Sequence, residues 1–301
     1  MTVRPASVVR PVLALDRRTL LRWGAGALLG GPFVVSACGG SGSSSGDSSG
    51  LPEGVQMATR WIPTELGSGV VRLPVSFSTA DGMLNPGPDR VVADVLRYDS
   101  GDRIATLSAE RSSLGVDTVP FWVFRVELDE PGLYSLMVDG GPSDGATFQL
   151  LEPDQFYVPR IGDSMPVFDT PTFDDSRGVD PICSREPEPC PFHEMTLTEA
   201  LAGGRPVIYV VGTPAHCTTG VCGPVLENLI TATDLTERAS VVHADVYTDA
   251  SATEVAPAVE AARLTFEPVA FVIDSDGTIV ERLDAVWSVD ELRSAVDSLL
   301  S

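Results

Sequence analysis

The stretch RPVIYVVGTPAHCTTGVCGP (205–224) decides how the C-terminal part of the chain is organised. Its apolar run up to Gly212 is typical of a strand that is buried on both faces. Cys217 and Cys222 follow with a Cys-x4-Cys spacing, and Pro224 suits the first turn of a helix. The pattern predicts two cysteines between the end of a buried strand and the start of a helix, where open α/β sheets place their sites.

The segments around this stretch predict alternating helices and strands. We expect helices at 196–204, 223–235, 253–264 and 288–300, strands at 205–212 and 239–249, and a hairpin at 268–283. Thr253 is the expected N-cap of the third helix. Ser288 and Glu291 have the spacing of a capping box at the start of the last one. The order predicts an α/β domain over residues 196–301.

Helix geometry restricts how Cys217 and Cys222 can be bonded. In a regular helix, residues five apart lie roughly 8–9 Å apart, whereas the Cα atoms of a disulfide lie within about 7 Å. A bonded pair therefore requires that the helix starts near Gly223 or that its first turn opens. A helix N-terminus also stabilises a thiolate, which favours a redox-active pair. A structural disulfide and a metal site with His216 or His243 remain alternatives.

The segments FEPVAFVID (266–274) and DSDGTIV (274–280) extend the pattern. With the cysteine stretch they resemble the thioredoxin-like superfamily over roughly residues 158–301. The resemblance implies a thioredoxin-like fold in which Pro268 is a cis-proline that lies against the redox cysteines.

The segment TPAHCTTGVCG (213–223) also looks like atypical peroxiredoxins, whose attacking and resolving cysteines are separated by four residues. This likeness implies that Cys217 attacks and Cys222 resolves. A peroxidase is the weaker interpretation, because Pro214 stands where peroxiredoxins hold threonine. Thr213 and Thr218 are candidate hydrogen-bond donors to the sulfur.

Residues 1–37 have the features of an export signal, with an arginine pair before a short apolar run. The pair resembles a twin-arginine signal, although general secretion is an alternative. Residues 35–38 resemble a bacterial lipobox, which implies lipidation of Cys38. The Gly/Ser-rich residues 38–50 would be a flexible tether. We expect a lipid-anchored protein on the extracytoplasmic face of the cell membrane.

Residues 51–152 predict an all-β accessory domain. Short runs rich in Val, Phe, Tyr and Leu alternate with turn residues, at 70–78, 90–98, 121–128, 132–140 and 146–152. This spacing is typical of an immunoglobulin-like β-sandwich. We expect Trp122 and Phe124 to share a core face; a binding role for Trp122 is the alternative.

Residues 153–195 predict a proline-rich connector between the two domains. It holds Cys183 and Cys190, and four cysteines besides Cys38 allow three pairings. We expect a structural 183–190 disulfide that closes a loop, beside the 217–222 pair. His193 follows in what we expect to be an exposed loop.

The net charge of −22 argues against nucleic-acid binding, because an acidic surface repels phosphates. We expect thiol–disulfide exchange with exported proteins or a membrane reductant, without a cofactor. A non-enzymatic cell-surface binding protein with structural disulfides is one alternative. A copper- or other metal-handling protein is the other.

Overall fold

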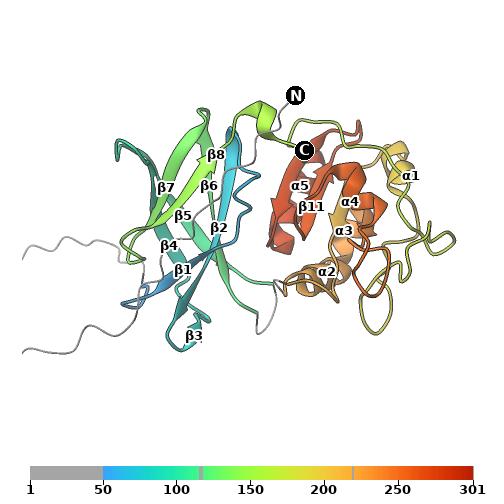
Figure 1. Cartoon of the computed structure of the whole chain (residues 1–301), viewed down its shortest axis with the longest axis horizontal. Helices are drawn as coiled ribbons and strands as arrows, with labels where there is room; N and C mark the ends of the chain where they lie inside the picture. The colour runs from blue at the N-terminus through green and yellow to red at the C-terminus, as the bar shows by residue number, and fades with distance from the viewer. Residues whose placement is uncertain (1–49, 115–117, 219, 301) are drawn as a thin grey trace, which may run out of the picture. The chain divides into compact units, whose positions relative to one another are not determined.

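Two sheets organise the described part of this protein, seen in a computed structural model that describes residues 50–114, 118–218 and 220–300 (Figure 1). The described residues belong to one compact unit. The predicted export signal, lipidated Cys38 and tether lie outside the described residues, apart from Gly50. No helix among the described residues is long and apolar enough to cross a membrane.

The first sheet is antiparallel and barrel-like, and its strands are blue to green in Figure 1. Its strands are β1 (Gln56–Thr59), β2 (Gly69–Thr79), β3 (Gly82–Met83), β4 (Arg90–Arg97), β5 (Arg103–Ser112), β6 (Phe121–Leu128), β7 (Gly132–Val138) and β8 (Ala146–Leu150). They are ordered β1-β2-β6-β5-β4-β7-β8, with β3 paired to β2. We call these strands the β region. All five predicted strands are present, so the all-β prediction is confirmed.

Strands β1, β3 and β5 were not predicted. The largest omission is β5, whose side chains are mostly exposed and polar. It nevertheless joins the two halves of the sheet, because it pairs with β4 along most of its length and with β6 at Arg111 and Ser112. A strand with so little buried apolar surface carries little of the alternation by which strands are found in a sequence.

Trp122 and Phe124 lie on the same core face of β6, as predicted, and both are fully buried. The indole Nε1 of Trp122 donates a hydrogen bond to the carbonyl of Pro88. The alternative of a binding role for Trp122 is therefore wrong. Aromatic burial of this kind stabilises the β region, because each buried ring removes a large apolar area from water.

The second sheet is mixed and has the strand order β10-β9-β11-β12. We call it, with its helices, the α/β region; it is yellow to red in Figure 1. The elements are α1 (Leu197–Ala202), β9 (Val207–Val211), α2 (Cys222–Thr231), α3 (Thr233–Arg238), β10 (Ser240–Ala244), α4 (Pro257–Ala262), β11 (Val269–Ile273), β12 (Ile279–Asp284) and α5 (Val289–Leu300). Strand β9 is parallel to β10 and antiparallel to β11, and β11 and β12 form the predicted hairpin.

Helices cover both faces of this sheet, as its apolar strands predict. Ile208 and Val210 of β9 pack in one cluster with side chains of α2, α3 and α5. Val207 and Tyr209 pack in another with side chains of α1 and α4. All five residues of β9 are buried. The prediction of a strand buried on both faces is confirmed.

Two helix boundaries differ from the predictions. The N-cap of α4 is Ala256, with Pro257 in the first turn. Thr253 instead donates its backbone N–H to the Asp249 carboxylate, so it belongs to a preceding turn. The helix expected at 223–235 is divided into α2 and α3 at Ala232, whose backbone leaves the helical region.

The capping box at the start of α5 is confirmed by two reciprocal bonds. The Ser288 N–H donates to Glu291 Oε2 over 3.2 Å, and the Glu291 N–H donates to Ser288 Oγ over 3.3 Å. Glu291 also accepts two hydrogen bonds from the guanidinium of Arg72 on β2, each 2.8 Å long. Because both side chains are mostly buried, this ion pair links the β region to α5 with little competition from water.

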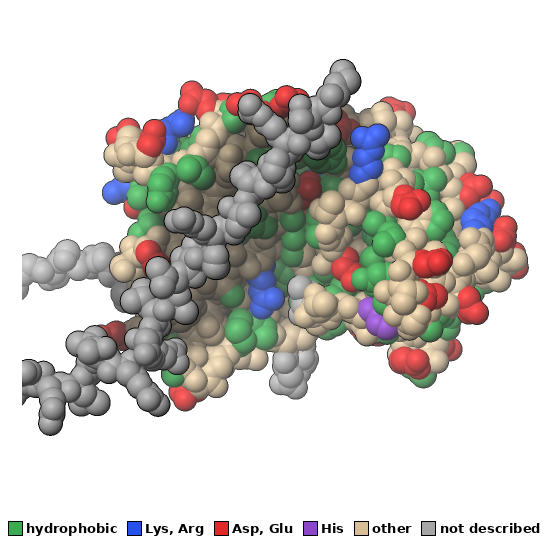
Figure 2. All heavy atoms as spheres, viewed as in Figure 1, with side chains coloured by type: hydrophobic (Ala, Val, Ile, Leu, Met, Phe, Trp, Pro, Cys, Tyr) green, Lys and Arg blue, Asp and Glu red, His purple; other side chains and the backbone are tan. Residues whose placement is uncertain are grey.

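The connecting segment 153–195 holds the short 3-10 helix η1 (Pro153–Gln155) and otherwise lacks helices and strands. Its loops pair with the α/β region at a few points, such as the Phe192 carbonyl, which accepts from the His243 N–H. Figure 2 shows acidic side chains scattered over the described surface on the face drawn.

Candidate functional site

The Cys217–Cys222 pair lies where the sequence predicts it, between β9 and α2. The two cysteines form a disulfide with a Cα–Cα distance of 5.9 Å. Cys222 is the first residue of α2, while Cys217 is in the preceding loop. Gly220 turns this loop with a positive φ of 69°, which favours glycine. The expectation that the helix starts near Gly223 is therefore met: α2 begins at Cys222, and Cys217 lies outside the helix.

The two sulfur atoms of this disulfide have different surroundings. Cys222 is buried, with 2% of its surface exposed, whereas Cys217 is half-buried at the surface end of the loop. The backbone N–H of Cys222 donates to Cys217 Sγ over 3.3 Å. Because the first amides of a helix have no intrahelical acceptor, this donor is available to stabilise negative charge on Cys217. A thiolate that approaches from solvent therefore reaches the sulfur of Cys217 before that of Cys222.

Pro268 and Glu267 form the inner wall of this site. The Glu267–Pro268 peptide is cis, as the resemblance implies. A Cβ atom placed on Gly212 would lie 3.2 Å from Pro268 Cβ and 3.7 Å from Cys222 Sγ. Gly212 therefore lets the proline and the buried cysteine approach the end of β9 closely.

Glu267 brings a carboxylate to the buried sulfur. Its Oε2 lies 3.7 Å from Cys222 Sγ and accepts a 2.5 Å hydrogen bond from the Thr213 N–H. Burial raises the pKa of Glu267, and the hydrogen bonds from Thr213 oppose this rise. A carboxyl group in this position can take a proton from Cys222 or return one to it.

The two threonines expected to donate to the sulfur lie differently. The hydroxyl of the buried Thr213 accepts from the Val246 N–H over 2.8 Å, so Thr213 ties the end of β9 to the residues after β10. Thr213 is linked to Cys222 Sγ through Glu267, whose Oε2 lies near both. Thr218 is exposed on the loop.

The other cysteine pair corrects a prediction, because Cys183 and Cys190 are free thiols rather than a disulfide. Both are buried, and their sulfur atoms face the imidazole of His243 on β10. Cys183 Sγ lies 3.7 Å and Cys190 Sγ 3.5 Å from His243 Nδ1. His193 Nε2 lies 3.2 Å from the same Nδ1. The predicted disulfide is absent because each sulfur lies beside Nδ1 of His243 and is not bonded to the other sulfur.

We call Cys183, Cys190, His193 and His243 the Cys-His cluster. One ligand atom from each residue lies within 4.8 Å of every other, and all four side chains are buried. His193 is fully buried, which overturns the expectation of an exposed loop residue. His216, the other histidine considered as a ligand, lies elsewhere: its Nε2 lies 3.1 Å from the Ala250 carbonyl, and its ring packs on Tyr247.

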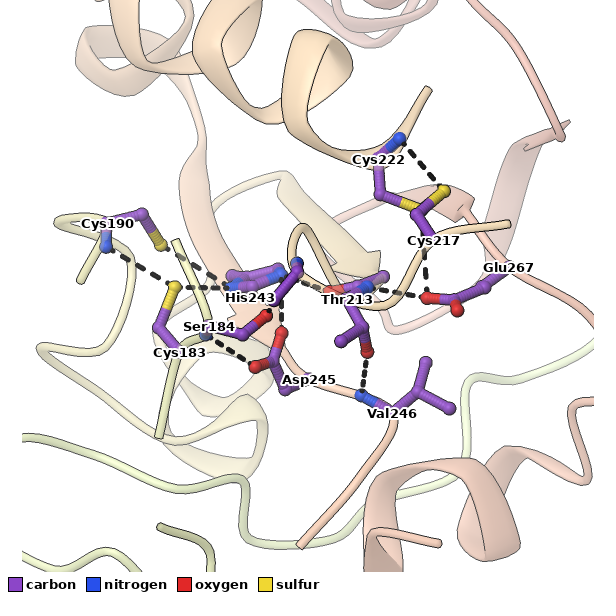
Figure 3. Close-up of polar contacts among 12 residues, drawn as sticks. Cys183, Ser184, Cys190, Thr213, Cys217, Cys222, His243, Asp245, Val246 and Glu267 are labelled. Atoms are coloured by element: carbon purple, nitrogen blue, oxygen red, sulfur yellow. Dashed lines mark hydrogen bonds and ion pairs between the residues drawn. A yellow bond between two sulfur atoms is a disulfide. The ribbon is translucent and has the colours of Figure 1, made fainter. Parts of the chain in front are cut away.

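Hydrogen bonds link the Cys-His cluster to the disulfide loop (Figure 3). His243 lies between the Cys183–Cys190 pair and Thr213, and its Nε2 donates to the Gly212 carbonyl over 2.9 Å. Beside Cys183, the Ser184 hydroxyl accepts from the Ala215 N–H over 3.2 Å. The loop that holds Cys183 and the loop that holds Cys217 are therefore connected by hydrogen bonds.

A buried carboxylate, Asp245, completes this neighbourhood. Its Oδ2 accepts a 2.6 Å hydrogen bond from the Ser184 N–H. Its Oδ1 lies 4.0 Å from His243 Nε2 and has no hydrogen-bond partner among the described residues. Burial raises the pKa of Asp245 to about 6.

The comparisons with known proteins leave this site to be interpreted from its own geometry. Neither a scan against protein-family models nor a search of the curated proteins finds a match for this chain.

Sequence reasoning missed His193, Asp245 and Glu267 as members of these sites. One signal was present: a Cys-x6-Cys-x2-His spacing in the connector, with His243 alone on a later strand. Local sets of cysteine and histidine with a further ligand at a distance are typical of zinc sites. The only sequence signal for Glu267 was its position directly before the candidate cis-proline, Pro268.

Proposed function

We propose that this protein catalyses thiol–disulfide exchange through Cys217 and Cys222. The observation that carries the proposal is the asymmetry of the pair. The half-buried Cys217 Sγ accepts from the first amide of α2, while the buried Cys222 lies against Glu267 and Pro268. A structural disulfide has no need of a helix amide at one sulfur and a carboxylate at the other.

The exchange proceeds in two steps that balance in atoms and electrons. A substrate thiolate attacks Cys217 Sγ, forms a mixed disulfide and displaces the Cys222 thiolate, which takes a proton from the neighbouring Glu267 carboxyl. A second substrate thiolate then attacks the substrate sulfur of the mixed disulfide and displaces Cys217 as a thiolate. The substrate gains a disulfide and loses two electrons, and the protein becomes the dithiol.

The reverse direction uses the same groups. The Cys217 thiolate, stabilised by the Cys222 N–H, attacks a substrate disulfide. Glu267 then takes the proton of Cys222, and the Cys222 thiolate attacks Cys217 Sγ to release the reduced substrate. Which direction operates depends on the potential of the pair relative to its compartment.

We also propose a thioredoxin-like fold for the α/β region. The strand order β10-β9-β11-β12 supports it, with β9 parallel to β10 and antiparallel to β11. The cis-proline directly before β11 and the two cysteines at the start of α2, with Cys217 in the preceding loop and Cys222 as the first helical residue, support it as well. The antiparallel strands of the β region support an immunoglobulin-like accessory domain less directly, because they join in one barrel-like sheet.

We further propose that the protein is attached to the outer face of the cell membrane through a lipid on Cys38. The lipobox-like residues 35–38 and the Gly/Ser-rich tether support this placement. Its substrates would be exported proteins or a membrane reductant. Partition of the wild-type chain into detergent, and of Cys38→Ala into the aqueous phase, is the expected result; wild type in the aqueous phase would contradict it.

A redox titration of the full chain, with alkylation and mass mapping at each potential, tests the exchange proposal. We expect the 217–222 bond to be reduced above about −250 mV, in the range of catalytic pairs. We also expect wild type, but not Cys217→Ser, to reactivate a reduced model protein that depends on its disulfides. A bond that resists reduction below about −300 mV would instead be structural. The binding-protein alternative would then replace the exchange proposal.

A further inference from the structure

We propose that Cys183, Cys190, His193 and His243 bind a zinc ion in a closed tetrahedral site. This inference is independent of the exchange proposal, because it rests on a different set of side chains. All four residues are buried, and their ligand atoms lie within 4.8 Å of one another.

The distances within the Cys-His cluster match the edges of a zinc tetrahedron. Zinc binds sulfur at about 2.3 Å and imidazole nitrogen at about 2.05 Å, which gives edges of about 3.6 Å from S to N and about 3.3 Å from N to N. The two S–N distances to His243 Nδ1 are 3.7 Å and 3.5 Å, and its distance to His193 Nε2 is 3.2 Å. These three edges share His243 Nδ1 and fit one central ion, and the other ligand atoms lie within 4.8 Å of one another.

The outer hydrogen bonds of both histidines direct a lone pair toward this centre. His243 Nε2 lies 2.9 Å from the Gly212 carbonyl, and His193 Nδ1 lies 3.4 Å from the Pro171 carbonyl. A carbonyl can only accept, so each of these ring nitrogens carries the hydrogen. The other two nitrogens then face each other as lone pairs, which repel unless a cation lies between them. Backbone carbonyls in this outer position are typical of histidines that ligate metals.

Charge favours a divalent cation over a proton in this position. Zinc with two thiolates and two neutral imidazoles is electrically neutral, which suits a fully buried cluster. Binding releases the two thiol protons to solvent and changes no oxidation state. Asp245 Oδ1 lies 4.0 Å from His243 Nε2 and has no hydrogen-bond partner among the described residues, so it is a buried acceptor beside this ring.

The ligand set selects zinc and a structural role. Tetrahedral sites with two sulfur and two nitrogen ligands are typical of zinc, whereas calcium and magnesium require oxygen ligands. Four protein ligands leave no open position for water, in contrast to catalytic zinc sites. The ion would fasten the connecting segment to β10 and, through the His243–Gly212 bond, to the end of β9.

Metal analysis of the full chain, purified with zinc in the growth medium, tests this inference with matched variants. We expect one zinc ion per chain in wild type, and loss of the ion in Cys183→Ser/Cys190→Ser and in His243→Ala. The control Cys217→Ser/Cys222→Ser, which alters the other cysteine pair, should keep its zinc. So should His216→Ala, which alters the other described histidine.

Two measurements on wild type guard against variants that fail to fold. Replacement of zinc by cobalt(II) should give the intense visible bands of a tetrahedral ion with thiolate ligands. Cys183 and Cys190 should resist alkylation until a chelator and a denaturant are added together. Wild type without bound zinc, with a linked 183–190 peptide in its mass map, would overturn the inference. So would an octahedral cobalt spectrum, or zinc that is lost from the Cys217→Ser/Cys222→Ser control.

Discussion

Two pairs of cysteines pack in the same core cluster beside the α/β sheet, yet their bonding and their surroundings differ. Cys217 and Cys222 are bonded to each other, and one of them is half-exposed. Cys183 and Cys190 are free and buried. Both pairs are close in sequence, so spacing alone does not separate them.

The neighbours of each sulfur explain the difference. A helix amide at Cys217 and a carboxylate at Cys222 suit a thiol that alternates between thiolate and disulfide. Two imidazoles beside Cys183 and Cys190 suit thiolates that share a cation. Under the two proposals, redox and metal-binding cysteines differ in the partners that the fold brings to them and not in their spacing.

The largest expected effect is on stability, through removal of the proposed zinc ion. The apparent free energy of zinc binding to small structural sites is on the order of 10 kcal/mol, so chelation should lower the free energy of unfolding by several kcal/mol. The 217–222 disulfide closes only a short loop in the unfolded chain, so its reduction should lower the free energy of unfolding by about 2 kcal/mol. Denaturant titrations with and without a chelator measure the first effect, and titrations with and without a non-chelating reductant measure the second. Equal effects would contradict the assignment of roles.

The next effect is on catalysis, through each cysteine of the redox pair. Cys217→Ser should reduce exchange to the uncatalysed background, because the attacked sulfur is absent. Cys222→Ser should instead accumulate a mixed disulfide at Cys217, because the resolving thiol is absent. Mass mapping after incubation with a disulfide-bonded model protein distinguishes them. Accumulation at Cys222 in the Cys217→Ser variant would reverse the assigned roles.

Much of the fold could be predicted, because its signals are local. The apolar run of β9, the Ser288–Glu291 capping box and the hairpin predicted at 268–283 each depend on nearby residues. The exposed strand β5 could not, because its pairing with β4 and β6 is fixed by the sheet and not by its own apolar pattern.

The position of the Cys217–Cys222 pair was predictable for the same reason, whereas the Cys-His cluster was not. Cys217, Cys222 and Pro268 have positions set by the adjacent strand and helix. The cluster depends on His243 of β10 meeting a loop more than fifty residues earlier, through the Phe192 backbone bond. Only the folded structure shows that His243 contacts this loop. From the sequence alone, a disulfide between the nearby Cys183 and Cys190 was the simplest prediction.

A smaller effect is expected at Asp245, which contacts the proposed zinc site from outside. Asp245→Asn keeps the size of the side chain but removes its charge near His243 Nε2. Loss of a hydrogen-bonded outer partner lowers metal affinity by about 10- to 100-fold, and we expect a smaller decrease here because Asp245 Oδ1 makes no hydrogen bond to the ring. Competition with a coloured chelator measures the affinity, with the exposed Asp276→Asn as a matched control. Equal affinities in the two variants would show that Asp245 does not act on the metal.

The smallest effect is expected at Glu267, and it should depend on pH. Burial raises the pKa of Glu267, so the folded state holds this proton more tightly than the unfolded state. Its contribution to stability is therefore present below the unfolded pKa and is lost as pH rises through the folded pKa. Glu267→Gln should gain stability over wild type as pH rises through this range, and it should resolve mixed disulfides more slowly. Parallel denaturant titrations at several pH values check the sign; a constant difference would contradict it.

The most direct experiment follows all four cysteines of the two pairs at once. The full chain, loaded with zinc, is equilibrated over a range of potentials, alkylated, and mapped by mass spectrometry. We expect that only Cys217 and Cys222 change, from bonded to alkylated, at a midpoint potential above about −250 mV. Cys183 and Cys190 should remain unmodified and unlinked throughout. A linked 183–190 peptide under oxidising conditions, together with a 217–222 bond that persists below about −300 mV, would contradict this expectation.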